Sequence, residues 1–483
     1  MRPVLSVLAR RGILAAAVAG GLLSGCGDFN VTDPNNPTLS DLTNNPNMAK
    51  LKLAANGLFI GARSDIVSII WRYGSMGREG ANLAGNNQPD YQEPFFGPLS
   101  TTQFGGADWF NEYASIRSIN VFMDAVPRAP DLSAQDRAGA IALGRTLRAL
   151  ALFYVIEARG ALGAPVDVDR PVSAAPAPFV SEDSVYGYII GDLDAAQDSL
   201  ADAGGGFFFP MPAGFSGFDT PATFLKVNRA LAARAWLFRA TATPSCGATC
   251  YNNALTALGL SFVTNSAADF GTGAYFDFST RPGDITNDLS EPLNGTTYFA
   301  LNFNVDDAQL QPGGQPDQRV LDKLSFIDPS DSTVNYTLSG FPFSVNRKFA
   351  VYFTGGQPDQ NASIPIIRDE ELVLLRAEAN IGLNNLAAAI TDLDLVRVNA
   401  GGLAPTTLTT ASPQSAFIDE LLYNRRYSLL WEQGARWVDA RRYGRLNTIE
   451  PAVPGGQVPT RMPIPANECA ARNLGTSCNP LGT

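Results

Sequence analysis

The sequence predicts a mainly α-helical protein in which helix pairs flank a long irregular segment. Two observations support this fold class. Apolar residues recur at helical spacing on both sides of residues 261–363, whereas inside that segment the periodicity fails and Gly, Pro, Asn, Asp and aromatic residues accumulate. Alanine-rich faces in the periodic parts would let neighbouring helices approach closely, as they do in helical-repeat proteins. We therefore expect one domain over residues 47–483, with an irregular insertion at about 261–363.

The N-terminus predicts a lipoprotein signal peptide over residues 1–25. Arginines precede an apolar run from Ile13 to Leu23, which is far shorter than the ~20 residues that span a bilayer. Leu23-Ser24-Gly25-Cys26 then resembles the bacterial lipobox, with cleavage before Cys26, and the alternative is an ordinary secretory signal followed by an incidental cysteine. We expect acyl chains on Cys26, a polar extended tether over residues 26–46, and no other stretch suited to span a membrane.

Helical segments follow the tether in a regular order. We expect them at residues 48–62, 108–126 and 134–159, from residue 182 after a Ser181 N-cap, from residue 226, from residue 370, after the turn at residues 382–385, and around residues 424–444. The segment from Trp71 to Phe104 is dense in Gly, Asn and aromatic residues and is expected to be loop-rich. Leu372, Leu375 and Ala379 share one apolar helical face.

Charged residues near the C-terminus have the spacing of ion pairs along one helix. Glu432 with Arg436 is an i, i+4 pair, and Arg436 with Asp439 and Asp439 with Arg442 are i, i+3 pairs. We interpret these charges as salt bridges that fix the helix against its neighbours. A catalytic role for Glu432 or Asp439 has little support.

Composition excludes several classes of function. The formal net charge is −11 and the pI is about 4.7, so the surface would repel nucleic acids. The chain contains no histidine, which removes Ser-His-Asp and Cys-His catalysis and every histidine metal site. The acidic loops at residues 304–307 and 328–331 lack EF-hand spacing, so we predict no metal site and no cofactor.

Four cysteines beyond Cys26 form two close pairs in the sequence, Cys246 with Cys250 and Cys469 with Cys478. Outside the cytoplasm, such pairs are most simply local disulfides. The alternative is a zinc site made of all four thiolates, but the second pair is more widely spaced than zinc ligands usually are.

Several motifs in the last quarter of the chain occur together in one known family. They are Ile364-Pro-Ile-Ile-Arg368, the run from Glu370 to Glu378, the run from Asn424 to Gly444 with Trp431 and Trp437, and Met462-Pro-Ile-Pro465. Their order resembles the C-terminal block of the SusD/RagB family of lipid-anchored nutrient-binding proteins of the bacterial outer membrane. Asp33-Pro-Asn-Asn-Pro37 and the segments around Arg148 and Arg234 are similar to the family's pattern too. The chain departs from the pattern at Asn424 and Ser428, where the family usually has glutamates.

The resemblance implies about four TPR-like helix pairs on one side of the molecule and a loop-rich ligand face on the other. It also implies a non-catalytic, lipid-anchored protein of the outer membrane that is exposed on the cell surface. Such a protein would pass an oligosaccharide or a peptide to a SusC-like TonB-dependent barrel. The residues leave two alternatives open, a carboxylate-based glycoside hydrolase that uses loop acids such as Glu79, Asp90 and Glu93, or a lipid-anchored scaffold that binds only proteins.

Aromatic residues outside the expected helices are the candidates for ligand contact, because sugar and peptide binding uses aromatic faces with a few polar groups. The candidates are Trp71, Tyr91, Phe95 and Phe96 in the first loop-rich segment, and Tyr275, Tyr298 and Phe341 in the insertion. Loop positions favour exposure, and the alternative for each residue is that it packs the loop onto the helices. Trp109, Trp236, Trp431 and Trp437 lie in helical patterns and are expected in the core.

Overall fold

A computed structural model describes residues 39–480 apart from residues 86, 172 and 244–245. Of the residues that the structure describes, 51% are in helices and 7% in strands, which confirms the mainly α class. The helices are α2 (Leu39–Asn44), α3 (Met48–Ala62), α4 (Ile66–Met76), α5 (Pro89–Phe96), α6 (Phe110–Ala125), α7 (Ala134–Arg159), α8 (Glu182–Ala201), α9 (Pro221–Ala242), α10 (Gly247–Gly259), α11 (Phe303–Asp306), α12 (Gln318–Lys323), α13 (Asp369–Gly382), α14 (Leu386–Asn399), α15 (Gln414–Ser428), α16 (Ala435–Arg442) and α17 (Ala466–Ala471). The expected signal peptide, residues 1–25, and Cys26 lie outside the described residues.

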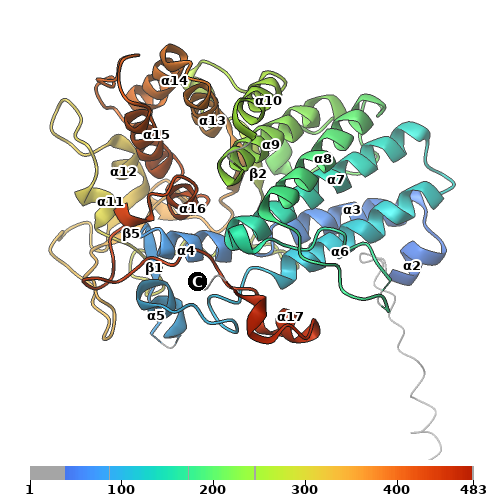
Figure 1. The fold of residues 1–483 in the computed structure, drawn as a ribbon, viewed down its shortest axis with the longest axis horizontal. Coiled ribbons are helices and arrows are strands. Elements are labelled where there is room, and N and C mark those ends of the chain that lie inside the picture. The colour runs from blue at the N-terminus through green and yellow to red at the C-terminus, as the bar shows by residue number, and fades with distance from the viewer. Residues whose placement is uncertain (1–38, 86, 172, 244–245, 481–483) are drawn as a thin grey trace, which may run out of the picture.

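Successive helices lie side by side and form a continuous scaffold (Figure 1). From α3 and α6 the row passes through α7, α8, α9 and α10 to α13, α14 and α15, and each of these helices contacts the next along the row. This arrangement confirms the TPR-like helix pairs that the sequence and the resemblance predict. The irregular segment, yellow in Figure 1, lies at one side of this scaffold beside α5 and α16.

Local side-chain interactions explain where the scaffold helices begin. Ser133 and Asp136 form a capping box at the start of α7, and Thr220 and Thr223 form another at the start of α9. The Ser181 hydroxyl accepts a hydrogen bond from the Ser184 N–H, so the N-cap predicted for α8 is confirmed. These caps satisfy N–H groups that have no partner within the helix, and they help to fix the starts of α7, α8 and α9.

Small residues allow the scaffold helices to approach closely. A Cβ atom on Gly144 in α7 would lie 2.6 Å from the Cγ of Met123 in α6, so no larger residue fits without movement. The face of α7 toward its neighbours also carries buried alanines, including Ala140, Ala149 and Ala151. This confirms that alanine-rich and glycine-rich faces mark the helix crossings.

Buried arginines join one scaffold helix to the next. Arg148 in α7 pairs with Asp192 in α8 at 2.7 Å. Further pairs join Arg234 in α9 to Glu371 in α13 (2.6 Å), Arg376 in α13 to Asp392 in α14 (2.7 Å), and Arg425 in α15 to Asp439 in α16 (2.7 Å). The guanidinium groups of Arg148, Arg234 and Arg376 make several hydrogen bonds each, so they fix both the distance between the helices and their relative orientation.

The predicted ion pairs within residues 432–442 are partly wrong. Glu432 pairs with Arg368 and Lys323 rather than with Arg436, and Arg436 pairs with Glu450 and Asp307. The pair between Asp439 and Arg442, at 2.9 Å, is confirmed. The reason is that the chain turns between α15 and α16, so Glu432 and Arg436 do not share a helix. Fixing this region against its neighbours remains the role of these charges.

Polar groups replace the two glutamates that the family pattern has at positions 424 and 428. The Arg319 guanidinium donates hydrogen bonds to Asn424 Oδ1 at 3.1 Å and to Ser428 Oγ at 3.0 Å. Asp317 takes the ionic contact with Arg319 at 2.6 Å. The local network therefore persists with neutral acceptors in place of carboxylates.

Short strands organise the irregular segment. The strands are β1 (Gly80–Asn82), β2 (Gly273–Phe276), β3 (Tyr298–Ala300), β4 (Leu324–Phe326), β5 (Arg347–Phe349), β6 (Phe353–Thr354), β7 (Gln357–Pro358) and β8 (Ile364–Arg368). One four-stranded sheet has the order β1-β3-β5-β4 and is antiparallel throughout. The antiparallel pair β2-β8 joins the two ends of the insertion directly in front of α13. The insertion is therefore less irregular than the sequence indicates.

Two segments expected to be irregular contain helices. The last part of the expected tether forms α2, where Leu42 is buried and Lys50 pairs with Asp41. The expected loop between residues 71 and 104 contains the end of α4, strand β1 and α5. Glycines at positions 74 and 77 suggested a loop, but Gly74 instead gives room to the Trp431 ring, 2.7 Å from where its Cβ would lie.

Two apolar segments satisfy the length and composition of a membrane span, contrary to the expectation from the sequence. They cover residues 48–76 and 134–162. In the second, 83% of the apolar window is buried inside the fold, so its hydrophobicity serves the core. The first joins α3 and α4, which are separate helices that meet at residues 63–65. Both segments are parts of the scaffold.

Disulfides join Cys246 to Cys250 and Cys469 to Cys478. The first closes a ring of a few residues at the start of α10, and the second joins α17 to the short turn at Gly475–Cys478. Each ring is short, so each constrains a local segment rather than the whole fold.

Candidate functional site

Most of the aromatic candidates for ligand contact are buried. Trp71, Tyr91, Phe95 and Phe341 are each exposed by less than 10%, so the expectation of exposed loop aromatics is wrong for them. Three of these four lie in helices α4 and α5, and their rings fill the space between those helices and the sheet. Phe96, in the last turn of α5, is 42% exposed.

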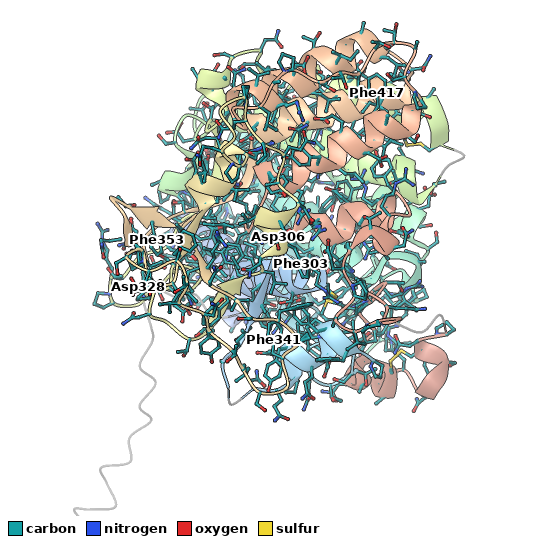
Figure 2. All side chains as sticks on the ribbon, turned by 90° about the vertical axis from the view of Figure 1, so that its left-hand side faces the viewer. Phe303, Asp306, Asp328, Phe341, Phe353 and Phe417 are labelled. Carbon is teal, nitrogen blue, oxygen red and sulfur yellow. A yellow bond between two sulfur atoms is a disulfide. The ribbon has the colours of Figure 1, made fainter. Side chains whose placement is uncertain are left out.

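The buried candidates belong to two aromatic groups. Trp71 contacts Tyr298 with ring centroids 6.4 Å apart, and Tyr298 in turn contacts Trp431 at 6.0 Å. Tyr91 and Phe95 meet Phe341 edge to face at 6.3 and 5.0 Å. Figure 2 shows Phe341 low on the face of the irregular segment, far from Phe417 in the helical part above it. These contacts hold the irregular segment on the scaffold.

Tyr298 differs from the other members of its group because it is half-buried. Burial raises the pKa of its hydroxyl, and the carboxylate of Asp288 raises it further. Trp109, Trp431 and Trp437 are buried as predicted, whereas Trp236 is only half-buried, which corrects the prediction for that residue.

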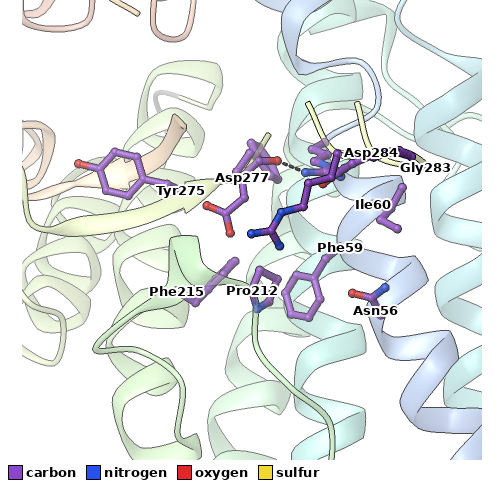
Figure 3. Close-up of a pocket in the computed structure, with 13 residues that line it drawn as sticks. Asn56, Phe59, Ile60, Pro212, Phe215, Tyr275, Asp277, Gly283 and Asp284 are labelled. Carbon is purple, nitrogen blue, oxygen red and sulfur yellow. Dashed lines mark hydrogen bonds and ion pairs between the residues drawn. The ribbon is translucent and has the colours of Figure 1, made fainter. Parts of the chain in front are cut away.

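The candidate binding site is a cavity of about 380 Å³ between α3, the segment at residues 212–215 and the turn that follows β2. Figure 3 shows side chains from these three parts of the chain around one space. Its volume lies at the lower end of the range typical of small-molecule pockets, which begins at about 300 Å³. Segments far apart in the sequence therefore come together here.

An apolar wall forms one side of the cavity. Phe59 from α3 and Phe215 from the short helix η3 (Ala213–Phe215) are buried, and their ring centroids lie 5.4 Å apart. Pro212 and Ile60 extend this wall, and Ile60 is 44% exposed. Such a wall can bury the apolar face of a sugar ring or an amino-acid side chain.

A network of charged groups forms the opposite side. The Arg63 guanidinium donates hydrogen bonds to the Asp277 carbonyl and to the Asp284 carboxylate. The Asp277 carboxylate accepts hydrogen bonds from the Gly214 N–H at 2.6 Å and from the Ser363 hydroxyl at 3.2 Å. Both carboxylates of the cavity are therefore already engaged in holding its walls together.

The close approach of η3 to β2 depends on Gly214. A Cβ at this position would lie 2.2 Å from the Tyr275 carbonyl oxygen, so a side chain would displace the backbone. The glycine thus permits the contact in which its N–H meets Asp277. This contact closes the cavity on the side of the insertion.

Two polar side chains of the cavity remain available for a ligand. Asn56 on α3 and Arg281 in the turn after β2 are exposed, and within the described part of the chain neither side chain forms a hydrogen bond or an ion pair. Together they offer amide and guanidinium donors and one amide acceptor. Their positions on opposite segments let one ligand meet both.

Among the predicted contact residues, Tyr275 lies at this cavity. Figure 3 shows its ring directed away from Asp277 and Phe215, and its hydroxyl donates to the Gly271 carbonyl. Tyr275 therefore contributes backbone to the wall, and burial raises the pKa of its hydroxyl. Sequence reasoning missed Asn56, Phe59 and Arg281, although the Pro282-Gly283 turn next to Arg281 was a signal of an exposed loop.

The loop acids considered for catalysis have structural partners. Glu79 is buried and accepts a hydrogen bond from the Trp431 N–H at 3.0 Å, and burial raises its pKa. Glu93 accepts from the Ser100 and Gly105 N–H groups at 2.9 and 3.0 Å. Within the described ranges, no group of three or more acidic or cysteine side chains is arranged to hold a metal ion.

Comparison with known proteins identifies relatives of the C-terminal part and of the whole fold. A sequence model of the SusD family matches residues 312–473. No curated protein matches the sequence significantly.

Solved structures share the fold over most of the chain. A SusD superfamily protein from Parabacteroides distasonis is 17% identical, with a TM-score of 0.64 over 87% of this chain and 97% of that one. A SusD superfamily protein from Bacteroides vulgatus is 15% identical, with a TM-score of 0.66 over 89% and 98%. A SusD-like carbohydrate binding protein from Bacteroides vulgatus is 15% identical, with a TM-score of 0.62 over 82% and 84%.

The C-terminal motifs, the matching family model and the shared fold agree with one another. They confirm the resemblance on which the expected scaffold rests. Residues 312–473 therefore resemble the SusD family in sequence, and the chain shares the fold of SusD superfamily structures over most of its length.

Proposed function

We propose that the protein is a non-catalytic nutrient receptor that binds an oligosaccharide, or alternatively a peptide, in the cavity between α3, η3 and the turn after β2. The observation that carries this proposal is the division of the cavity into an apolar wall and two polar side chains without partners. A ligand with an apolar face and a hydroxyl or carbonyl edge fits both. The carbohydrate-binding relative from Bacteroides vulgatus favours the sugar.

The cavity favours binding over hydrolysis. Glycoside hydrolysis needs two carboxyl groups that face one bond, one as an acid and the other as a base or nucleophile. Asp277 is held by a backbone N–H and a hydroxyl, and Asp284 by Arg63. Because both carboxylates support the walls, they are poorly placed to exchange protons with a substrate.

Replacing Asn56 and Arg281 together with alanine should weaken ligand binding by roughly 60-fold to 700-fold. A neutral hydrogen bond contributes about 1 kcal/mol and one from a charged group about 1.5–3 kcal/mol, and 1.4 kcal/mol corresponds to tenfold. Screening the wild type on arrays of oligosaccharides and peptides selects the ligand, and calorimetry then compares the variants. Both side chains are exposed, so the unfolding temperature should change little.

The matched control replaces an exposed asparagine and an exposed arginine elsewhere, Asn252 and Arg117. This variant should bind like the wild type. Equal affinity of the Asn56→Ala, Arg281→Ala variant and the wild type would place the site elsewhere. Mass spectrometry of the bound ligand after long incubation tests for turnover, and steady product release that one carboxylate substitution abolishes would support the hydrolase alternative.

We further propose that acyl chains on Cys26 hold the protein at the outer membrane, beside its transporter. The described fold serves as the receptor, and a SusC-like TonB-dependent barrel would carry the ligand inward. The lipobox-like Leu23-Ser24-Gly25-Cys26 and the match of residues 312–473 to the SusD family model support this arrangement. In it, the ligand would lie between the receptor and the barrel.

The wild type should fractionate with outer membranes, and a TonB-dependent barrel should co-purify with it after mild solubilisation. The Cys26→Ala variant should leave the membrane fraction, because two or more acyl chains are needed for stable anchoring. Incorporation of labelled lipid into the wild type alone is the control. Recovery of the tagged wild type without a barrel, under detergents that preserve other membrane complexes, would contradict the partnership.

A further inference from the structure

A second cavity, of about 300 Å³, lies in the scaffold and shares no lining residue with the first. It is bounded by the end of α7, the start of α8, the end of α9 and the last turn of α16. Arg441, Arg442 and Arg461 line it, with Glu182 as the acidic residue of its wall. We refer to it as the arginine cavity.

The arginines of the arginine cavity differ in whether a carboxylate pairs with them. Arg442 is paired with Glu378 and, at 2.9 Å, with Asp439. Arg441 donates to the carbonyl oxygens of Glu157 and Thr460, and its guanidinium lies 4.7 Å from the centre of the Trp437 ring. These contacts hold the Arg441 side chain in place, but none of them neutralises its charge.

Arg461 also lacks a carboxylate partner. Its Nε donates to the Thr460 hydroxyl at 3.1 Å, while its Nη1 is buried without a hydrogen-bond acceptor. Within the part of the chain that the structure describes, neither Arg461 nor Arg441 forms an ion pair. A buried hydrogen-bond donor without an acceptor lowers the stability of the fold. A bound acceptor would therefore stabilise Arg461 Nη1.

The positive charges of the cavity lie close together, because burial and the charge of Arg441 both lower the pKa of Arg461. Burial raises the pKa of Glu182, whereas Arg441, Arg461 and Arg442 lower it. The positive end of the twenty-residue helix α8 begins at Glu182 and adds to the potential.

We propose that the arginine cavity binds a small oxyanion, namely a carboxylate, sulfate or phosphate group, free or carried by a molecule about the size of one sugar ring. Guanidinium groups bind such oxygens through paired N–H donors. The Phe238 ring and the Thr241 side chain supply a mixed apolar and polar wall for the rest of the molecule. The anion would pair directly with Arg441 and Arg461, which form no ion pair with any side chain of the described fold.

Calorimetric titration with sulfate, phosphate, glucuronate and glucose, at constant ionic strength in chloride, tests the proposal. We expect saturable binding of at least one oxyanion and none of glucose. Binding of sulfate or phosphate would show that the site takes a free anion. Tighter binding of glucuronate would show that it takes an anion carried by a sugar. Arg461→Gln should weaken binding at least tenfold, because a charged donor is lost.

Two further variants separate binding from a structural role. Glu182→Gln should strengthen oxyanion binding several-fold, because it removes the negative charge of the wall, and this outcome does not depend on the Arg461 variant folding. Arg445→Gln, in a partly exposed pair with Asp419, should leave affinity unchanged. The variant that lacks Asn56 and Arg281 should also bind oxyanions normally, so failure here is distinct from failure at the first cavity.

Absence of saturable binding by every oxyanion would overturn the proposal. So would wild-type affinity in Arg461→Gln, or weaker binding in Glu182→Gln. Binding of an aspartate-rich peptide with none of the small oxyanions would instead identify the cavity as a docking site for a protein.

Discussion

Replacing Glu371 with leucine should lower the free energy of unfolding by about 3–5 kcal/mol, the cost of leaving one charge of a buried pair alone. Glu371 is fully buried and accepts hydrogen bonds from Arg234 at 2.8 and 2.6 Å and from Gln433 at 2.8 Å. The substitution would leave the Arg234 guanidinium uncompensated between α9 and α13. Urea unfolding, followed by helical circular dichroism, measures the change as a lower midpoint with a similar slope.

The double variant Arg234→Met, Glu371→Leu is the informative control. Removing both charges should restore most of the lost stability, since apolar replacements of buried pairs are often neutral. Asp419→Ala, which breaks the exposed pair with Arg445, should cost at most about 1 kcal/mol. Equal losses in Glu371→Leu and Asp419→Ala would contradict the view that buried arginines fix the scaffold.

Replacing Trp431 with alanine should lower the free energy of unfolding by about 3–5 kcal/mol, as is typical for a buried tryptophan. Its ring is fully buried and stacks on Phe349, with centroids 3.8 Å apart and planes inclined by 6°. A Cβ on Gly80 would lie 2.7 Å from the same ring, so the surroundings are fitted to it and cannot easily fill the space. Chemical denaturation measures the loss.

Trp236→Ala provides the comparison, because Trp236 is half-buried on the scaffold. This substitution should lower the free energy of unfolding by about 1 kcal/mol, which is typical of substitutions in general. The Trp431 variant should also loosen the irregular segment before the helices, since Phe349 belongs to β5. Hydrogen exchange in residues 347–349 that stays as slow as in the wild type would argue against this link.

Helix positions could be predicted where the sequence itself carries the signal. The bounds expected for α3 and α7 agree with the structure, because caps and apolar spacing lie within each segment. The same reasoning failed for the end of α4 and for α5, where the density of Gly, Asn and aromatic residues suggested a loop. There the contact with Trp431, more than 300 residues away, stabilises the helix.

The candidate site was harder to predict than the scaffold. Aromatic residues in apparent loops were expected to be exposed, but Tyr91 and Phe341 face each other in the interior. The cavity instead uses Asn56 and Phe59, which lie in a helix whose pattern marks only its core face. No local pattern shows that this helix meets the turn at Arg281, because the contact joins segments more than 200 residues apart.

Asp277 has a consequence for how the ligand preference of the cavity could change during evolution. This carboxylate connects η3 and Ser363 to the end of β2, while Asp284 is held by Arg63. Residues 281–283, which lie between these two contacts, can therefore vary while the rest of the cavity keeps its shape. A new ligand preference would then need substitutions at only a few positions of one turn. The helices that the arginine ion pairs join could stay unchanged.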